Sequence, residues 1–177
     1  MSDFRGRVAL LAGWFVLAAS PVSGQGCVDD PEFGALDFWV GEWNVSVGEQ
    51  HVGTNRIEKI LEGCAILEHW VAADGGEGKS LFYHQPATGE WKQVWVTTTP
   101  DRPGGVKEKT LVERLPDGGL RFQGEIPVPG GGKYLDRTTL TPAGDGTIHQ
   151  VIEHSTDDGE TWQVGFDALY TPAKPSE

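Results

Sequence analysis

The chain has 177 residues, of which 38% are apolar, so it is long enough to bury one hydrophobic core. Its net charge of −12 argues against nucleic acid and anionic membrane surfaces as partners, because both attract clustered basic residues. The 25 glycines and 11 prolines argue against a helical bundle, and the apolar content argues against a disordered chain.

Residues 1–24 have the features of a secretory signal peptide. Arg5 and Arg7 precede a 13-residue apolar run, Val8–Ser20, and small residues up to Gly24 would allow cleavage there. A membrane anchor is the alternative, but 13 apolar residues are fewer than the roughly 20 that span a bilayer. We therefore expect residues 25–177 to form the mature domain, which is periplasmic or secreted and has no stable membrane insertion.

Two cysteines, Cys27 and Cys64, belong to this mature part. An even number of cysteines in an exported protein favours a disulfide, with two free buried thiols as the alternative. The bond would close a loop of about 37 residues and stabilise the fold by roughly 3–4 kcal/mol. Lipidation of Cys27 is a second alternative, but the preceding Gly24-Gln25-Gly26 lacks the aliphatic residue typical of such sites.

From residue 43 onward, short runs of strand-forming residues alternate with turn residues. Turn signals such as Asp74-Gly75-Gly76 and Pro116–Gly119 recur at near-regular spacing, as in consecutive antiparallel hairpins. Only Pro31–Phe38 predicts a helix, and it is short. About ten hairpin-linked strands predict an all-β fold, a single antiparallel up-and-down barrel, with a β-sandwich as the alternative. The expected strands are Trp43–Val47, Gly53–Glu62, Ala65–Ala72, Ser80–Gln85, Glu90–Thr98, Lys107–Leu115, Leu120–Glu125, Tyr134–Thr141, Thr147–Ser155 and Trp162–Tyr170.

Alternation along the strands assigns the side chains to two faces. Glu68 shares a face with Ile66 and Trp70, and Gln93 lies between Trp91 and Trp95 on a face of another strand. Aromatic faces with single polar residues are typical of a barrel interior that holds a ligand. The alternative is that the tryptophans are ordinary core and that Glu68 points to water. The last strand is expected to present one apolar face, made of Trp162, Val164, Phe166, Ala168 and Tyr170.

The sequence offers few motifs for catalysis or metal binding. His149 and His154 lie five residues apart, so on one strand they face opposite sides and cannot bind one metal together. We expect neither a metal nor a cofactor. Ser155–Trp162 matches the Asp-box pattern Ser-x-Asp-x-Gly-x-Thr-Trp, which we interpret as a structural turn. Glu68 and Glu153 could act as an acid/base pair if the barrel placed both in one cavity.

Leu36–Val45, with the sequence LDFWVGEWNV, resembles the opening motif of a family of secreted bacterial proteins. That family is catalogued as a domain of unknown function with a lipocalin-like (calycin) β-barrel. The resemblance supports pairing of Cys27 with Cys64, because the family usually carries a cysteine before the motif. It implies no reaction, because the family has no agreed activity. Further matches, spread over nearly all of residues 27–170, are Gly53–Ile57, Gly63–Trp70, Gly78–Tyr83, Thr88–Val96, Asp136-Arg137, Ser155–Trp162 and Phe166–Tyr170.

Within the same motif, Gly41-x-Trp43 is similar to the Gly-x-Trp signature that opens lipocalin barrels. In lipocalins this tryptophan closes one end of the barrel beneath an arginine from a late strand. The resemblance points to Arg137 for that role.

Three hypotheses for the function follow. The first is an exported barrel that binds a small, partly apolar ligand. The second is a small isomerase, cyclase or hydrolase that uses Glu68 as general base, with Arg137 or Tyr83 as electrostatic partner. The third is a structural or interaction module of the cell envelope without a pocket. The candidate ligand-binding residues are Asn55, Glu68, Trp70, Tyr83, Trp91, Gln93, Trp95 and Arg137.

Overall fold

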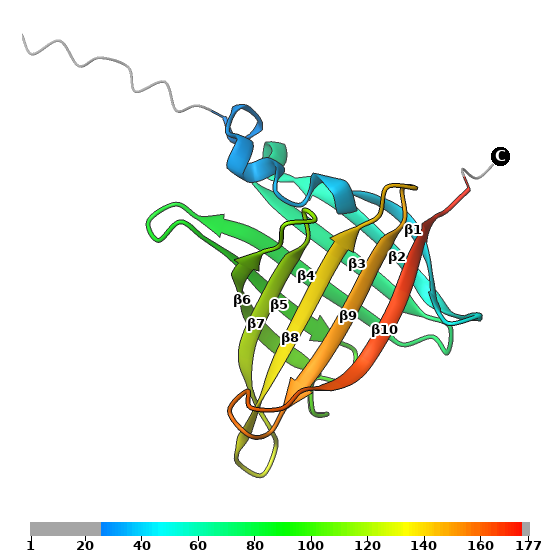
Figure 1. The fold of residues 1–177 in the computed structure, drawn as a ribbon, viewed down its shortest axis with the longest axis vertical. Coiled ribbons are helices and arrows are strands. Elements are labelled where there is room, and N and C mark those ends of the chain that lie inside the picture. Colours follow the sequence, from blue (N-terminus) through cyan, green and yellow to red (C-terminus); the bar gives the residue numbers. More distant parts are fainter. Residues whose placement is uncertain (1–25, 175–177) are drawn as a thin grey trace, which may run out of the picture.

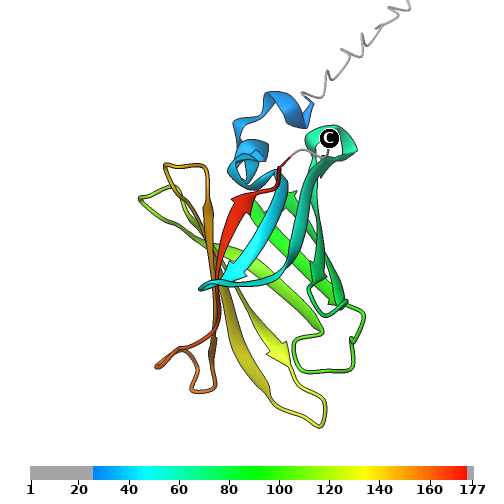
Figure 2. The same ribbon diagram turned by 90° about the vertical axis from the view of Figure 1, so that its right-hand side faces the viewer.

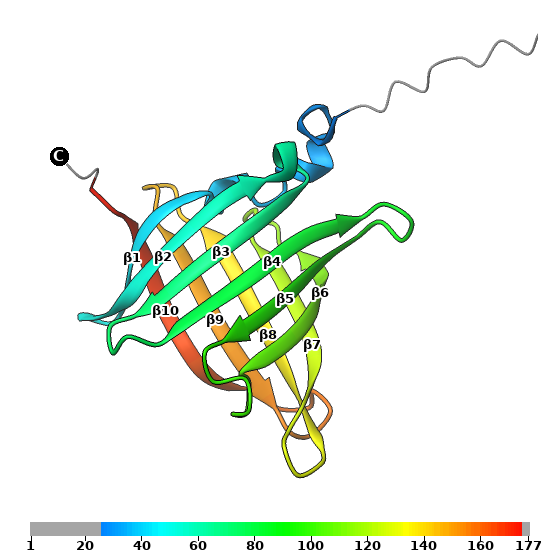
Figure 3. The same cartoon turned by 180° about the vertical axis from the view of Figure 1, so that it is seen from behind.

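The computed structural model describes residues 26–174, so the expected signal segment, residues 1–24, lies outside the described residues. Ten antiparallel strands form a closed barrel in which each strand pairs with its neighbours in the chain and β1 pairs with β10 (Figures 1 and 3). The predicted all-β up-and-down barrel is therefore confirmed. The strands are β1 Gly41–Val47, β2 Gln50–Ile60, β3 Ala65–Ala72, β4 Glu77–Gln85, β5 Glu90–Thr97, β6 Val106–Arg114, β7 Leu120–Pro127, β8 Lys133–Pro142, β9 Ile148–Ser155 and β10 Gln163–Pro172.

A short helical segment precedes the barrel and lies across one of its ends (Figure 2). It consists of three 3-10 helices, η1 Cys27–Asp29, η2 Pro31–Gly34 and η3 Asp37–Trp39, where the sequence predicted one helix. A fourth, η4 Leu61–Gly63, links β2 to β3. Among residues 26–174, no helix is long and apolar enough to cross a membrane.

The helical segment is anchored in the barrel by aromatic packing and by two indole hydrogen bonds. Trp39 is fully buried and packs edge-on against Phe82, with ring centroids 5.4 Å apart. The indole Nε1 of Trp43 donates to the Trp39 carbonyl at 2.9 Å, and Nε1 of Trp91 donates to the Glu32 carboxylate at 3.0 Å. Since the main core cluster gathers these tryptophans, one end of the barrel is plugged with side chains.

A disulfide between Cys27 and Cys64 ties η1 to the residue that follows η4. The two Cα atoms are 5.0 Å apart, which is within the usual range for a bridge. The pairing expected from the even cysteine count is therefore present in the structure.

The last strand departs from the predicted pattern at Gly165. Phe166 lines the interior, and Ala168 and Tyr170 are buried as expected, but Val164 is 60% exposed. The β9–β10 register shifts between Val164 and Phe166, so a bulge reverses the faces of the residues before it. The expectation of one unbroken apolar face on β10 was therefore wrong at its beginning.

The β9–β10 turn has the hydrogen bonds expected of an Asp box. The Asp157 carboxylate accepts from the backbone N–H of Thr161 at 2.9 Å and from its hydroxyl at 2.5 Å. The Ser155 hydroxyl donates to Asp157 at 2.7 Å, and the Trp162 indole donates to the Gly159 carbonyl at 3.1 Å. Asp157 thus organises a turn, as the sequence predicted. These hydrogen bonds lower the pKa of Asp157 to about 2.

Candidate functional site

Away from the plugged end, the barrel interior contains a cavity of about 240 Å³. Residues from β3, β5, β6, β8, β9 and β10 contribute to its wall, so it is a central cavity and not a surface groove. Trp70, Trp95 and Phe166 are each only partly buried around it, which means that the aromatic side chains leave this part of the interior unfilled. The lining residues are Glu68, Trp70, Gln93, Trp95, Lys107, Lys109, Thr138, Gln150, Ile152, His154, Gly165, Phe166 and Tyr170.

Two of the aromatic side chains lie flat against glycines of the adjacent strand. A Cβ at Gly78 would lie 2.3 Å from Trp95 Cη2, and one at Gly53 would lie 2.7 Å from Trp70 Cη2. Only glycine leaves room for the indole rings there. Trp70 also packs edge-on against Phe166, with centroids 6.4 Å apart. The glycines therefore leave room for both indoles beside the strands, where they line the cavity.

One polar side of the cavity is a cluster of charges around Asp136 on β8. Asp136 is fully buried, and its Oδ2 lies 2.6 Å from Lys107 Nζ and 3.1 Å from His154 Nε2. Lys109, also buried, forms an ion pair with Asp136 Oδ1 and donates to the Thr138 hydroxyl at 2.5 Å. Both lysines lie on β6 and reach across β7 to β8.

The charges in this cluster shift one another's protonation. Burial lowers the pKa of Lys109 to about 8, although the carboxylate of Asp136 opposes the shift. Burial alone would raise the pKa of Asp136, but the positive charges of Lys109 and Lys107 outweigh it and the net shift is downward. At neutral pH, Lys109 is therefore protonated and Asp136 is ionised.

A second polar group surrounds Glu68 on β3. Asn55 Nδ2 donates to Glu68 Oε1 at 2.8 Å, and Gln93 Nε2 donates to the Ser80 hydroxyl at 3.1 Å. The Tyr170 hydroxyl donates to Gln150 Oε1 at 2.7 Å. Burial raises the pKa of Glu68, although hydrogen bonds from Ser80 and Asn55 oppose the shift. The neutral acid is favoured by this environment.

Five of the eight candidate residues gather at this site. Glu68, Trp70, Gln93 and Trp95 line the cavity, and Asn55 lies behind Glu68 as its hydrogen-bond donor.

The other three candidates lie elsewhere. Trp91 belongs to the plugged end, where it packs against Phe33 with centroids 6.2 Å apart. Tyr83 follows the buried Phe82 on β4, so its side chain points to the outer face.

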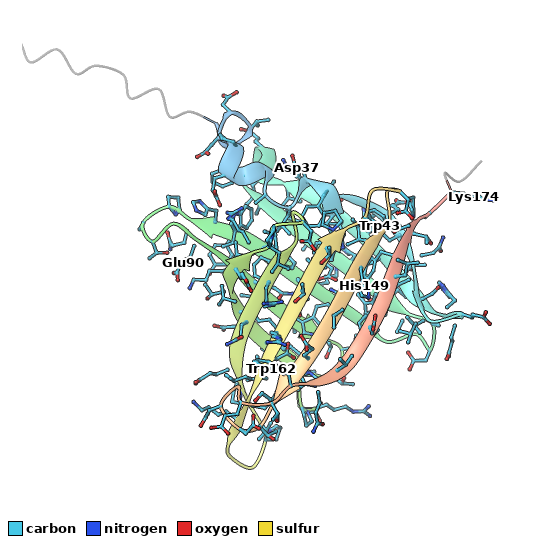
Figure 4. All side chains as sticks on the ribbon, viewed as in Figure 1. Asp37, Trp43, Glu90, His149, Trp162 and Lys174 are labelled. Carbon is cyan, nitrogen blue, oxygen red and sulfur yellow. A yellow bond between two sulfur atoms is a disulfide. The ribbon has the colours of Figure 1, made fainter. Side chains whose placement is uncertain are left out.

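Arg137 also lies on the outer face of the barrel. Its guanidinium binds both carboxylate oxygens of Glu153, at 2.7 and 2.9 Å, and its Cζ lies 3.9 Å from the Trp162 ring centroid. Trp162 and Trp43 lie toward opposite ends of the barrel (Figure 4). Arg137 is therefore not the lipocalin-like arginine above Trp43. Since Glu153 faces outward with Arg137, the barrel does not place Glu68 and Glu153 in one cavity, and the acid/base pair that this would have allowed does not form.

The sequence interpretation overlooked the basic side of the cavity, namely Lys107, Lys109, Asp136 and His154. One signal was available, because Lys107 and Lys109 share a strand face with Leu111. Against that, a Lys-x-Lys run is more often a solvated strand face. In comparisons with known proteins, no family model and no curated sequence matches this chain.

Proposed function

We propose that the protein is an exported barrel that binds a small, partly apolar ligand in its central cavity. One observation supports the proposal: four aromatic side chains, Trp70, Trp95, Phe166 and Tyr170, border a space of about 240 Å³ that the side chains of residues 26–174 leave open. An apolar wall with a few placed polar groups is typical of small-molecule sites. The cavity also disfavours the third hypothesis, which required a tightly packed interior.

The size of the cavity limits the ligand. Pockets for drug-sized ligands usually measure roughly 300–1,000 Å³. A cavity of about 240 Å³ therefore suits a smaller molecule with one or two rings. Export is supported by the Cys27–Cys64 disulfide, because such bonds persist in oxidising compartments, and by the signal-like sequence of residues 1–24.

A cavity-filling variant tests the binding function. Indole, quinoline, cinnamate and cinnamamide would be screened by saturation-transfer NMR and by tryptophan fluorescence. Ile152→Trp would fill the cavity from β9, while Val151→Trp adds the same side chain on the opposite face of that strand. We expect binding to wild type and to Val151→Trp, and loss of binding in Ile152→Trp. Absence of binding to folded wild type, or equal binding to both variants, would contradict the proposal.

Catalysis by Glu68 is the second candidate function, and the burial of this carboxyl beside the cavity favours it. Burial raises its pKa, and a carboxyl with a raised pKa in a cavity is typical of groups that exchange protons with a substrate. Tyr83 and Arg137, which the sequence suggested as electrostatic partners of Glu68, lie on the outer face of the barrel. Lys109 would therefore supply the positive charge near Glu68. Bound ketones and esters would be incubated in D₂O with wild type and with Glu68→Gln. Exchange of the carbon-bound protons by wild type alone would support an enzyme, and no exchange would leave a binding protein.

A further inference from the structure

We infer that the ligand is a small organic acid, with its carboxylate against Lys107 and Lys109 and its planar body against Trp70, Trp95 and Phe166. This inference rests on the proposed function, because it assigns the chemistry of the molecule in the same cavity.

The first argument for an anionic ligand is the balance of charge around Asp136. Two ammonium groups, Lys107 and Lys109, face one ionised carboxylate, Asp136. Glu68 belongs to the second polar group, where Asn55 donates to its Oε1 at 2.8 Å, and burial raises its pKa. His154 contacts the same carboxylate and brings no negative charge. The cluster around Asp136 thus holds two ammonium groups for one carboxylate although the whole chain carries −12, and an anion would offset this local charge where water is scarce.

The second argument is that Lys107 and Lys109 have N–H donors available for a ligand. Each ammonium group has three N–H donors. Lys107 directs one of them to Asp136, and Lys109 directs one to Asp136 and one to Thr138. Among residues 26–174, the remaining N–H groups have no further side-chain acceptor. Both lysines line the cavity, so these donors are available to a carboxylate held there.

The third argument is the arrangement of charged and aromatic side chains in the cavity wall. The lysines enter from β6, while Trp70, Trp95 and Phe166 lie on β3, β5 and β10. A ligand with a charged group at one end and a flat apolar body would therefore contact both sides at once. Gln93 is buried, and its Oε1 finds no hydrogen-bond partner within residues 26–174, so a hydroxyl on the ligand would satisfy it.

A matched ligand series tests the inference. 4-Hydroxyphenylacetate, 4-hydroxyphenylacetamide and tyramine share one ring and carry charges of −1, 0 and +1. The full mature chain would be titrated with each by calorimetry at pH 7. Because hydrogen bonds to charged groups are strong, we expect the acid to bind roughly tenfold or more tighter than the amide, and tyramine to bind weakest. The negative charge of the protein surface attracts the cationic tyramine. Tighter binding of the acid than of tyramine would therefore come from the interior lysines.

Two lysine variants test whether the cavity lysines cause the preference for the acid over the amide. Lys107→Met removes a cavity ammonium, and Lys79→Met removes an exposed one from the outer face of β4 with the same change in net charge. We expect Lys107→Met to abolish most of the preference for acid over amide, and Lys79→Met to keep it. Lys107→Arg, which retains the charge, should restore the preference.

The possible failures are distinguishable. Equal affinities of wild type for acid and amide would overturn the organic-acid inference and leave the binding function standing. The same conclusion would follow if Lys79→Met and Lys107→Met lost the preference equally. If none of the three compounds bound to folded wild type, the inference would also fall. The fragment screen and Ile152→Trp would then decide the binding function separately.

Discussion

Lys109 and Asp136 form a buried ion pair that crosses an intervening strand. Lys109 lies on β6 and Asp136 on β8, with β7 between them. Both side chains are almost completely removed from solvent, and Lys107 reaches the same carboxylate at 2.6 Å. The pair joins alternate strands, and its lysine also lines the cavity.

Asp136→Asn should strongly destabilise the protein. It removes the carboxylate that pairs with Lys107 and Lys109. The two ammonium groups then remain in a low-dielectric interior without their anionic partner. Breaking a buried pair in this way typically costs about 3–5 kcal/mol, which urea unfolding would measure. The matched control is Asp167→Asn, which removes the carboxylate of an exposed pair with His149 and should cost about 1 kcal/mol or less. Equal losses in the two variants would mean that the Asp136 cluster is solvated.

Gly124→Ala tests how closely β6 and β7 approach beside the ion pair. A Cβ at Gly124 would lie 2.0 Å from the Glu108 carbonyl oxygen, and backbone cannot move aside as a side chain tip can. Overpacking of this kind typically costs about 1–3 kcal/mol. Gly144→Ala is the control, because a Cβ there meets nothing within 4 Å. Thermal unfolding should separate the two variants, and an unchanged melting temperature in Gly124→Ala would contradict the close approach.

Glu68→Gln should change how stability depends on pH. The pKa of Glu68 is raised in the folded state by burial, so the folded protein holds this proton to higher pH than the unfolded chain does. Its contribution is therefore fully present below the unfolded pKa of about 4.5 and is lost as pH rises through the folded pKa. Relative to Glu68→Gln, wild type should lose stability as the pH rises from about 4.5 upward.

The measurement compares urea midpoints of wild type and Glu68→Gln across that range. Other titrating groups are shared, so they cancel in the difference. A difference that stayed constant would mean that folding does not shift the pKa of Glu68, and one that favoured wild type increasingly with pH would mean that folding lowers it. Either result would contradict the prediction.

Removal of the disulfide should weaken the attachment of the N-terminal cap. A bond that closes a loop of 37 residues stabilises by about 4 kcal/mol in the chain-entropy model. We expect the double variant Cys27→Ser/Cys64→Ser to lose an amount of this order in urea unfolding. Wild type treated with a reductant is the control and should lose the same amount. A much smaller loss would mean that the segment is held mainly by the packing of Trp39 and Trp43.

The sequence alone predicted about ten hairpin-linked strands and favoured a barrel over a sandwich, because hairpin turns and strand-forming runs are local signals that recur along the whole chain. It also grouped Glu68 with Trp70, and Gln93 with Trp91 and Trp95, on shared strand faces, since alternation has a fixed period of two. Which of these faces point inward stayed open until the structure. Where that period is broken, the prediction failed. The bulge at Gly165 exposes Val164, and a local pattern contains no sign of it.

Only the tertiary structure decided which faces meet around the cavity. On β8, leucines occur on both faces, so alternation did not show that Asp136 points inward and Arg137 outward. Lys107, Lys109 and Asp136 come from strands that are not adjacent, and closure of the barrel brings their charges together. Local alternation decides which face of a strand carries a charged side chain. Which residue that side chain pairs with across the interior depends on the register and curvature of the whole sheet.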